Sequence, residues 1–466
     1  MRAVEPGSYR DPDSRVLIAD DAVYRVLSEE GLADWRALRE SSLFGELTDE
    51  GLIVETTEDG GDPQPGALDK PQAGVLRHAR IPLVSYPYEW TFGMLRDAAL
   101  LQLDLTARAI DAGLMLKDAS PYNVQWVGAQ PVFVDIGSFE RLREGEPWAG
   151  YRQFCGLFLN PLLLQAYRGI DFQPWLRGSL EGIAPGEADK LFSLRDHFRR
   201  GVFTNVHLHA RLEQRNAARA GGEAKRELRE ANFKTELVQA NVARLRKLVA
   251  RLDWKLPQSA WTGYRDENTY SEADDGVKRA FVEAAVASGR PARVWDLGAN
   301  DGAYSRLAVA AGATQVLALD SDHATVEALY RALRDEQDTT ILPLVADLAN
   351  PSPGLGWRGL ERRPLVDRGA PDLVLALALV HHLSIGANVP LREVVAWLRS
   401  LDAAIVVEFP TPEDPMVERL RSGKREGTHP DYHVEHFERC LGELFEVSRR
   451  EELPSGVRVL YALDPR

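Results

Sequence analysis

The spacing of apolar positions changes near residue 258 of this chain. After that point, short apolar runs alternate with segments of helical spacing. Apolar strands that alternate with helices indicate a doubly wound parallel sheet of the Rossmann-like kind. The predicted strands of this α/β domain are 293–297, 315–320, 340–345, 373–379 and 404–409, and a last antiparallel pair is expected at 444–447 and 457–463.

The chain before residue 258 mixes strand-like and helical segments without regular alternation. The segment 91–112 has apolar residues at helical spacing and predicts a long amphipathic helix. Other predicted elements are strands at 15–19, 52–55, 81–86 and 131–136, helices at 20–43 and 222–252, and a loop rich in Pro and Gly at 59–72. The pattern predicts an α+β domain over 1–204, a helical connector over 205–257 and the α/β domain over 258–466.

Composition limits the class of protein. The chain has 466 residues, 44% hydrophobic and 27% charged, which is typical of a folded protein with room for two cores. A formal net charge of −14 argues against a protein that coats nucleic acid or anionic membrane, because both need a basic surface. The two cysteines are too few for a disulfide framework or a cysteine-built zinc site, and no metal site is predicted. The longest apolar run, 373–380, is shorter than the roughly 20 residues of a membrane helix, and no signal peptide is recognised, so we expect a cytoplasmic protein.

A glycine-containing loop follows the first strand of the α/β domain. The strand ends at Asp296, and Gly298 and Gly302 come before the next helix. Gly298 allows a tight turn beside a ligand, and Gly302 allows close packing of the helix. An ordinary strand-to-helix turn is the alternative interpretation.

Acidic residues end the next two strands. Asp320 is placed to accept both hydroxyls of a ribose, since a carboxylate has two acceptor oxygens. Asp347 is placed to reach an adenine amino group. The carboxyl ends of parallel strands meet at one edge of a sheet, so these groups predict a nucleoside site there.

Together these motifs resemble the class I S-adenosyl-L-methionine (SAM)-dependent methyltransferases, over about residues 260 to 466. The loop lacks the three-glycine fingerprint of dinucleotide-binding proteins. The resemblance implies SAM as the cofactor, with a cover of three aromatic residues whose alternative role is to pack the domain edge. The implied cofactor residues are Asp296, Gly298, Ala299, Asn300, Gly302, Asp320, Ser321, Asp347, Leu348 and Ala378, and the aromatic residues are Trp261, Tyr264 and Tyr270.

Three residues are candidates for the catalytic base. Methyl transfer is an in-line substitution that needs positioning, and a base if the acceptor arrives protonated. His381 and His382 follow the fourth strand, and Glu408 lies at the end of the fifth. Each histidine has the alternative role of a helix cap or a packed side chain. We expect O- or N-methylation of a small-molecule or glycan-type acceptor, with RNA or protein as the alternative; the oligomeric state stays open, a homodimer included.

A second constellation lies in the first half of the chain. Asp118, Asn123 and Asp135 have the spacing of the catalytic loop and metal-binding Asp of protein kinases and antibiotic phosphotransferases, which this region resembles. The glycine-rich loop is absent, and Lys70, the only lysine before residue 117, lies in the predicted loop. Arg77 or Arg80 could replace the missing lysine. The resemblance implies a degenerate kinase-like domain; the alternatives are an unrelated hairpin, or an active kinase-like domain in a bifunctional or nucleotide-regulated protein.

The tandem arrangement also resembles bacterial nodulation-protein-like methyltransferases. The matching motifs are Ser-Tyr-Pro-Tyr-Glu-Trp at 85–90, Leu-Lys-Asp-Ala-Ser-Pro-Tyr-Asn at 116–123, and the glycine loop. This resemblance supports the two-domain architecture more than any particular acceptor.

Overall fold

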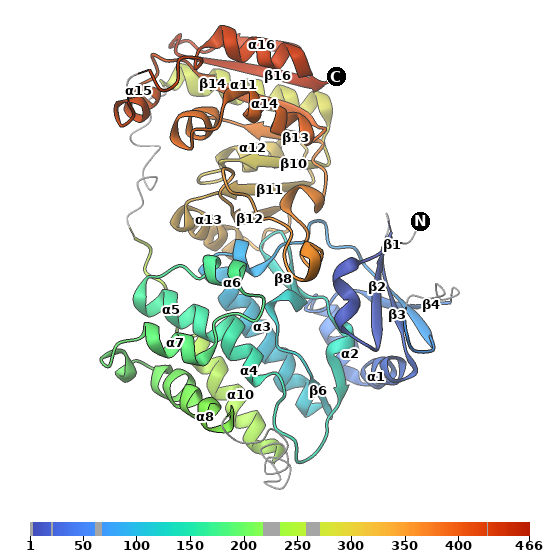
Figure 1. The fold of residues 1–466 in the computed structure, drawn as a ribbon. Coiled ribbons are helices and arrows are strands. Elements are labelled where there is room, and N and C mark those ends of the chain that lie inside the picture. Colours follow the sequence, from blue (N-terminus) through green and yellow to red (C-terminus); the bar gives the residue numbers. More distant parts are fainter. Residues whose placement is uncertain (1–2, 20–21, 61–67, 218–233, 258–270, 426) are drawn as a thin grey trace. The chain divides into compact units, whose positions relative to one another are not determined.

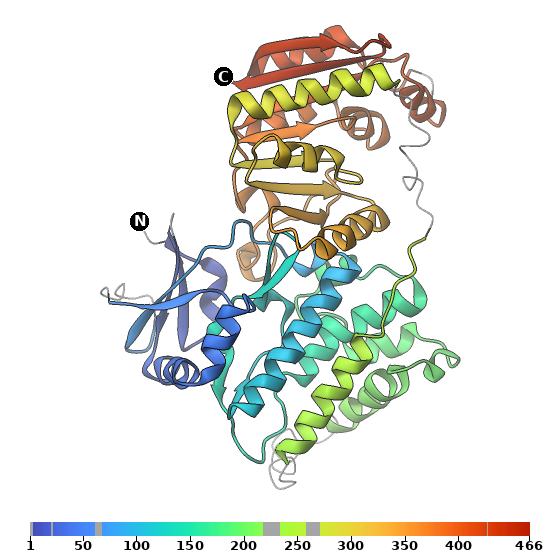
Figure 2. The same cartoon turned by 180° about the vertical axis from the view of Figure 1, so that it is seen from behind.

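The computed structural model describes the whole chain except residues 1–2, 20–21, 61–67, 218–233, 258–270 and 426. The chain forms two compact units. Unit 1 comprises Met1–Trp126, Pro131–Lys255 and Gly354–Arg362, and unit 2 comprises Val127–Gln130, Leu256–Pro353 and Arg363–Arg466. Figures 1 and 2 show the two units from opposite sides. The main boundary lies near residue 256, but each unit also takes a short segment from the other half of the sequence.

The sheet of unit 2 has seven strands in the order β12-β11-β10-β13-β14-β16-β15. The first five strands in this order are parallel, and β16 pairs antiparallel with both β14 and β15. The strands are β10 (Arg293–Leu297), β11 (Gln315–Asp320), β12 (Ile341–Val345), β13 (Leu373–Ala376), β14 (Ala404–Pro410), β15 (Phe445–Glu452) and β16 (Arg458–Pro465). The predicted doubly wound parallel sheet with a final antiparallel pair is thus confirmed.

Helices cover both faces of this sheet. In Figures 1 and 2, α11, α12 and α13 lie on one face, and α14 and α16 lie on the other. This agrees with right-handed crossovers that run in opposite directions from β10. The helices of unit 2 are α11 (Glu272–Gly289), α12 (Ala303–Ala310), α13 (His323–Asp335), α14 (Leu391–Ser400), α15 (Pro415–Ser422) and α16 (Val434–Leu444).

Two local features set the shape of the sheet's carboxyl edge. Gly302 begins α12 with a φ of 78°, and a Cβ there would lie 2.7 Å from Leu329 Cδ1, so only glycine fits. β13 ends at Ala376, earlier than predicted, because the chain turns at Ala378, which has a φ of 49°. The residues after β13 therefore leave the sheet plane at its edge.

Unit 1 begins with a five-stranded antiparallel sheet in the order β1-β2-β3-β5-β4. The strands are β1 (Ala3–Val4), β2 (Ser14–Ile18), β3 (Val23–Leu27), β4 (Thr56–Asp59) and β5 (Gly74–His78), with helices α1 (Glu29–Glu40) and α2 (Ser42–Asp49) between β3 and β4. The predicted helix over 20–43 was wrong at its start, because Val23–Leu27 alternates in burial as a strand and pairs with β2 and β5. The strand predicted at 81–86 is absent from the structure, and β5 comes before it.

The rest of unit 1 is mainly helical and is built around α3 (Phe92–Asp111), which confirms the predicted long helix. Thr91 caps α3 by accepting a hydrogen bond from the Met94 backbone N–H. The other elements are β6 (Leu114–Leu116), β7 (Val124–Val127), β8 (Gln130–Phe133), β9 (Phe139–Arg141), α4 (Tyr151–Phe154), α5 (Asn160–Arg168), α6 (Gln173–Gly178), α7 (Pro185–Leu191), α8 (Leu208–Ala217) and α10 (Thr235–Val249), joined by short 3-10 and π-helical turns. Helices α8 and α10 were predicted as a connector, but they belong to unit 1, where α10 packs against α3.

The segment Gly354–Arg362 follows β12 in the chain but is part of unit 1. Glu361 is buried and accepts hydrogen bonds from Arg10 Nε at 3.0 Å and Nη2 at 2.8 Å, and from the Tyr9 hydroxyl. The Arg362 guanidinium lies 4.0 Å from the centroid of the Tyr122 ring. These contacts attach the segment to the first residues of the chain and to the loop after β6.

In the part of the chain that the structure describes, every helix is too short or too polar to cross a membrane.

Candidate active site

A cavity of about 420 Å³ lies at the carboxyl edge of the unit 2 sheet. Ligands of doubly wound sheets bind at this edge, where the parallel strands end. Most of the residues predicted for the cofactor line it, as does one of the predicted bases. These residues are Asp296, Gly298, Ala299, Asn300, Asp320, Ser321, Asp347, Leu348, Ala378 and His382.

The other predicted residues lie elsewhere. Gly302 closes the turn into α12 instead of lining the cavity. His381 and Glu408 are completely buried behind the cavity wall. Trp261, Tyr264 and Tyr270, the predicted aromatic cover, lie outside the described residues.

The glycine loop folds over the end of β11. The backbone N–H groups of Gly298 and Ala299 both donate to the Leu319 carbonyl, at 2.8 and 2.9 Å. Gly298 and Asn300 have positive φ angles of 79° and 49°, so the loop turns sharply and leaves open space beside it. This shape leaves room for the close backbone approach to a ligand that the sequence predicts.

Asp320 is held by the loop itself. Its Oδ2 accepts a hydrogen bond from the Asn300 backbone N–H, and its Oδ1 accepts one from the Asp322 backbone N–H, both at 2.9 Å. A carboxylate has about four acceptor positions, so each oxygen can accept a further bond from a ribose hydroxyl. Burial raises the pKa of Asp320.

Asp296 lies deeper in the same wall. The Ser305 hydroxyl donates to Asp296 Oδ2 at 2.6 Å. Burial raises the pKa of Asp296 to about 6, so the carboxyl is ionised at neutral pH and can hold a cationic group of a ligand.

Two cations of α11 line the cavity and were missed by the sequence analysis. Lys278 is buried, and its Nζ lies 4.9 Å from the centroid of the Tyr304 ring, whereas the neighbouring Arg279 is exposed. The charge of Lys278 is balanced by Glu408, so it is the positive charge of Arg279 beside the glycine loop that suits the carboxylate of an amino-acid ligand. The usable signal was a Lys-Arg pair on the helix directly before the loop.

His382 is the predicted base that reaches the cavity. Its ring centroid lies 4.1 Å from that of the buried His381. Burial, together with the charge of Arg458, lowers the pKa of His382 to about 4. The imidazole is therefore neutral at physiological pH, which is the form that accepts a proton.

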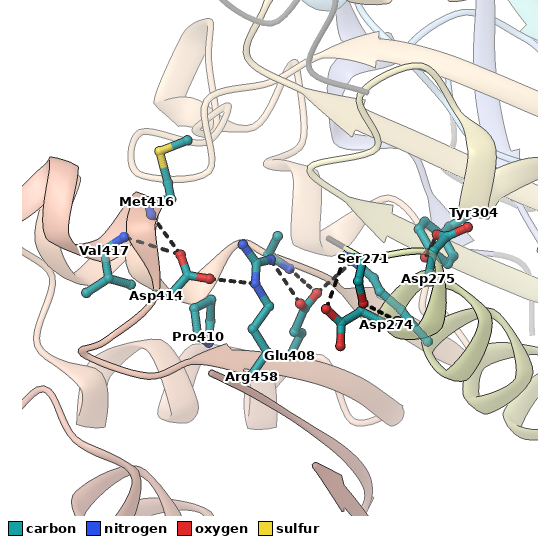
Figure 3. Close-up of polar contacts among 12 residues, drawn as sticks. Ser271, Asp274, Asp275, Tyr304, Glu408, Pro410, Asp414, Met416, Val417 and Arg458 are labelled. Carbon is teal, nitrogen blue, oxygen red and sulfur yellow. Dashed lines mark hydrogen bonds and ion pairs between the residues drawn. The ribbon is translucent and has the colours of Figure 1, made fainter. Parts of the chain in front are cut away.

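Glu408 lies at the centre of a buried network (Figure 3). Its Oε1 pairs with Arg458 Nη1 at 3.0 Å, and its Oε2 pairs with Lys278 Nζ at 2.7 Å. Oε2 also accepts a hydrogen bond from the Ala378 backbone N–H at 3.0 Å. Arg458 Nε pairs in turn with Asp414 Oδ2 at 2.7 Å. With both oxygens bound and no surface on the cavity, Glu408 has the geometry of a positioning residue that holds the turn after β13.

No family model matches the chain. It is 35% identical over 466 residues to nodulation protein NoeA of Rhizobium meliloti (strain 1021), a match that spans 98% of this chain and 95% of NoeA. The chain belongs to the NoeA family. The predicted resemblance to nodulation-protein-like sequences is therefore confirmed along nearly the whole length of the chain.

Solved structures of methyltransferases match about half of the chain. Magnesium protoporphyrin IX methyltransferase of Synechocystis PCC 6803, solved with bound SAH, is 18% identical, with a TM-score of 0.31, over 44% of this chain and 95% of that chain. The N-methyltransferase NodS of Bradyrhizobium japonicum WM9 is 12% identical, with a TM-score of 0.31, over 42% of this chain and 99% of NodS. The bifunctional kinase-methyltransferase WbdD is 17% identical, with a TM-score of 0.30, over 47% of this chain and 46% of the WbdD chain.

The network around Glu408 predicts a loss of stability on Glu408→Gln. The variant leaves Lys278 and Arg458 buried with one carboxylate fewer, and breaking a buried ion pair costs about 3–5 kcal/mol. We expect a lower midpoint of thermal unfolding than in Glu446→Gln, a matched change on the exposed face of β15. Equal midpoints in the two variants would contradict the positioning role.

The pKa of His382 gives a second prediction. In protein labelled with ¹³C at the histidine rings, the His382 signal, assigned by its loss in His382→Gln, should titrate with a midpoint of about 4. Because the folded-state pKa lies below the ordinary value of about 6.5, the ring stays neutral as the pH falls from 8 to 5. A midpoint at or above the ordinary value would show that the ring is open to solvent.

Proposed function

We propose that this NoeA-family protein transfers a methyl group from SAM to an oxygen or nitrogen of a small-molecule or glycan-type acceptor. The observation that supports this proposal most directly is a single cavity lined both by Asp320 and the glycine loop and by the neutral His382. The net charge of −14 favours such an acceptor over RNA. An RNA or protein acceptor is the alternative, and a basic surface beside the cavity would favour it.

The residues of the cavity have distinct tasks in this proposal. Asp320 accepts the ribose hydroxyls, and the backbone of the glycine loop packs against the amino-acid part of the cofactor. Asp296 balances the positive charge of the ligand, and Arg279 faces a carboxylate. When bound, SAM supplies a methyl group activated by a sulfonium.

His382 completes the reaction in this proposal. The lone pair of the acceptor atom forms the new bond to the methyl carbon as the bond from carbon to sulfur breaks. The acceptor's proton moves to the neutral imidazole of His382. Glu408 contributes by fixing the turn at Ala378 through the hydrogen bond from its backbone N–H. Ala378 lines the same cavity as the glycine loop and His382.

We also propose that unit 1 has a degenerate kinase-like core. Protein kinases have a lysine on their third strand, then a catalytic Asp, an Asn five residues later and a metal-binding Asp. In unit 1, Asp118 and Asn123 lie in the loop between β6 and β7, and Asp135 follows β8. Burial and the nearby charge of Asp135 raise the pKa of Asp118, which supports a shared acidic site.

Arg25 takes the place of the lysine in this proposal. It lies on β3, and its Nη1 pairs with Asp135 Oδ1 at 2.8 Å. Arg77 and Arg80, the candidates from the sequence, lie on and after β5, where Arg80 donates to the Ala19 carbonyl. The ion pair with Arg25 occupies Asp135, the residue that would bind the metal ion, and the sequence has no glycine-rich loop to hold the phosphates. Both features favour a core that no longer transfers phosphate.

Cofactor binding tests the first proposal. In calorimetric titrations, SAM or its demethylated product SAH should bind, and Asp320→Ala should weaken binding at least about tenfold, or roughly 1.4 kcal/mol. Asp335→Ala, an exposed acid on α13 that pairs with the adjacent Arg334, is the control and should bind normally. Failure of both ligands to bind the unmodified chain would end the proposal.

Phosphoryl transfer tests the second proposal. With γ-labelled ATP and Mg²⁺, the unmodified chain should release or transfer no more label than Asp118→Asn, which lacks the acid expected to act as the base. Transfer that occurs in the unmodified chain and is lost in Asp118→Asn would instead indicate an active kinase-like domain in a bifunctional protein.

A further inference from the structure

Three side chains of unit 1 lie close together in a region that follows the kinase-like motif by more than 50 residues. Asp189 lies on α7, His197 on the short 3-10 turn Asp196–Phe198, and His207 at the end of the π-helical turn Phe203–His207. One oxygen or nitrogen of each lies within 4.8 Å of those of the other two. The proposed methyl transfer gives this cluster no task.

Both histidines face the same carboxylate oxygen. His207 Nδ1 lies 2.9 Å and His197 Nε2 lies 3.8 Å from Asp189 Oδ1, and the two ring centroids are 4.5 Å apart. Zinc binds histidine nitrogen and carboxylate oxygen at about 2.0–2.2 Å in tetrahedral sites, which places neighbouring ligand atoms about 3.3–3.6 Å apart. The observed distances lie on either side of this value, so small rotations of the side chains would form the site.

A hydrogen bond between Asp189 and His207 is the simpler interpretation of the cluster. It accounts for the 2.9 Å contact but gives no reason for the approach of His197 to the same oxygen. The nearby arginines do not compete for Asp189, since Arg168 and Arg199 both pair with Asp196. Among the described residues, no lysine or arginine pairs with this carboxylate, so two imidazoles and one carboxylate are a suitable ligand set for a metal ion.

The surroundings also suit a bound ion. The side chains of His197, His207 and Asp189 are 17%, 18% and 28% exposed, so an ion could enter and keep a water ligand. The half-exposed Phe203 ring lies 6.4 Å from the His197 ring and 5.7 Å from the His207 ring, centroid to centroid, and covers one side of the cluster. An apolar side limits competition from water for the ligands.

We propose that Asp189, His197 and His207 bind a zinc ion, with a fourth position left for water or another small ligand. Two imidazole nitrogens favour zinc over magnesium or calcium, which prefer oxygen ligands alone. The ion joins α7 to the two short turns that precede α8. It therefore stabilises the last part of unit 1, independently of the proposed methyltransferase activity.

The sequence analysis predicted no metal site because these ligands follow no familiar motif. They are eight and ten residues apart and lie on three different short elements. Only the packing of α7 against the π-helical turn brings them together.

Zinc binding by the full chain tests the proposal. After removal of metal with a chelator, the protein is titrated with Zn²⁺ in competition with a chromophoric chelator, and thermal unfolding is measured with and without Zn²⁺. We expect one zinc that depends on the cluster and a higher unfolding midpoint when it is bound, whereas Mg²⁺ should have no effect. Substitution of His197→Ala or His207→Ala should weaken this binding at least about tenfold, since even outer-shell changes cost that much.

Two further variants guard against misfolding and against unrelated sites. Asp189→Asn keeps the size and hydrogen-bonding ability of the side chain but removes its charge, so it should fold and bind zinc more weakly. His429→Ala, in unit 2, removes a histidine from outside the cluster and should bind zinc as the unmodified chain does. If zinc does not bind, or binds equally to the unmodified chain and to Asp189→Asn and His207→Ala, the cluster is only a hydrogen-bonded pair beside a second histidine.

Discussion

The shape of the cavity in unit 2 depends on the ion pairs and the hydrogen bond of the buried Glu408 carboxylate. The carboxylate is completely buried, and removing an isolated charge from water is far more costly than any single contact can offset. Lys278 and Arg458 supply the opposite charge, and Asp414 balances the second cation. The four charges sum to zero within a small volume and join α11, β14, β16 and the start of α15. Because Glu408 also binds the Ala378 N–H, this neutral cluster fixes one wall of the cavity.

The same burial acts on the groups that face the ligand. It raises the pKa values of Asp296 and Asp320 and lowers that of His382. At neutral pH Asp296 is still ionised, and the imidazole of His382, which lines the same cavity, is uncharged. A cationic cofactor is attracted by the first group and is not repelled by the second. Desolvation therefore keeps His382 uncharged, as the proposed transfer from a sulfonium requires, while it opposes the ionisation of Asp296 without preventing it at neutral pH.

The parts of the structure that could be predicted depend on local patterns. The parallel strands of unit 2 are mostly apolar runs, and the glycine loop combines Asp296, Gly298 and Gly302 within a few residues. Their positions at one sheet edge then follow from the parallel order of the strands. Nearly all of the predicted cofactor residues that line the cavity lie in the glycine loop or directly at the end of a parallel strand.

The parts that could not be predicted depend on partners far away in the sequence. Glu408 was placed at the correct sheet edge, but its role follows from Arg458 on an antiparallel strand and Lys278 on an earlier helix. Arg25 was missed because β3 was interpreted as the start of a helix, and its partner Asp135 lies beyond the long helix α3. A pattern within one segment contains no information about such pairs.

The segment Gly354–Arg362 has a consequence for how this family can evolve. Although it is encoded within the second half of the gene, its anchoring residue Glu361 binds Tyr9 and Arg10 near the start of the chain. A fragment that begins at residue 258 would contain this segment without its binding residues, and the complementary fragment would expose those residues. Recombination between distant relatives at the apparent domain boundary would thus join an anchor to a foreign partner. Exchange of one half therefore preserves this contact only if the new half supplies matching residues at both ends of it.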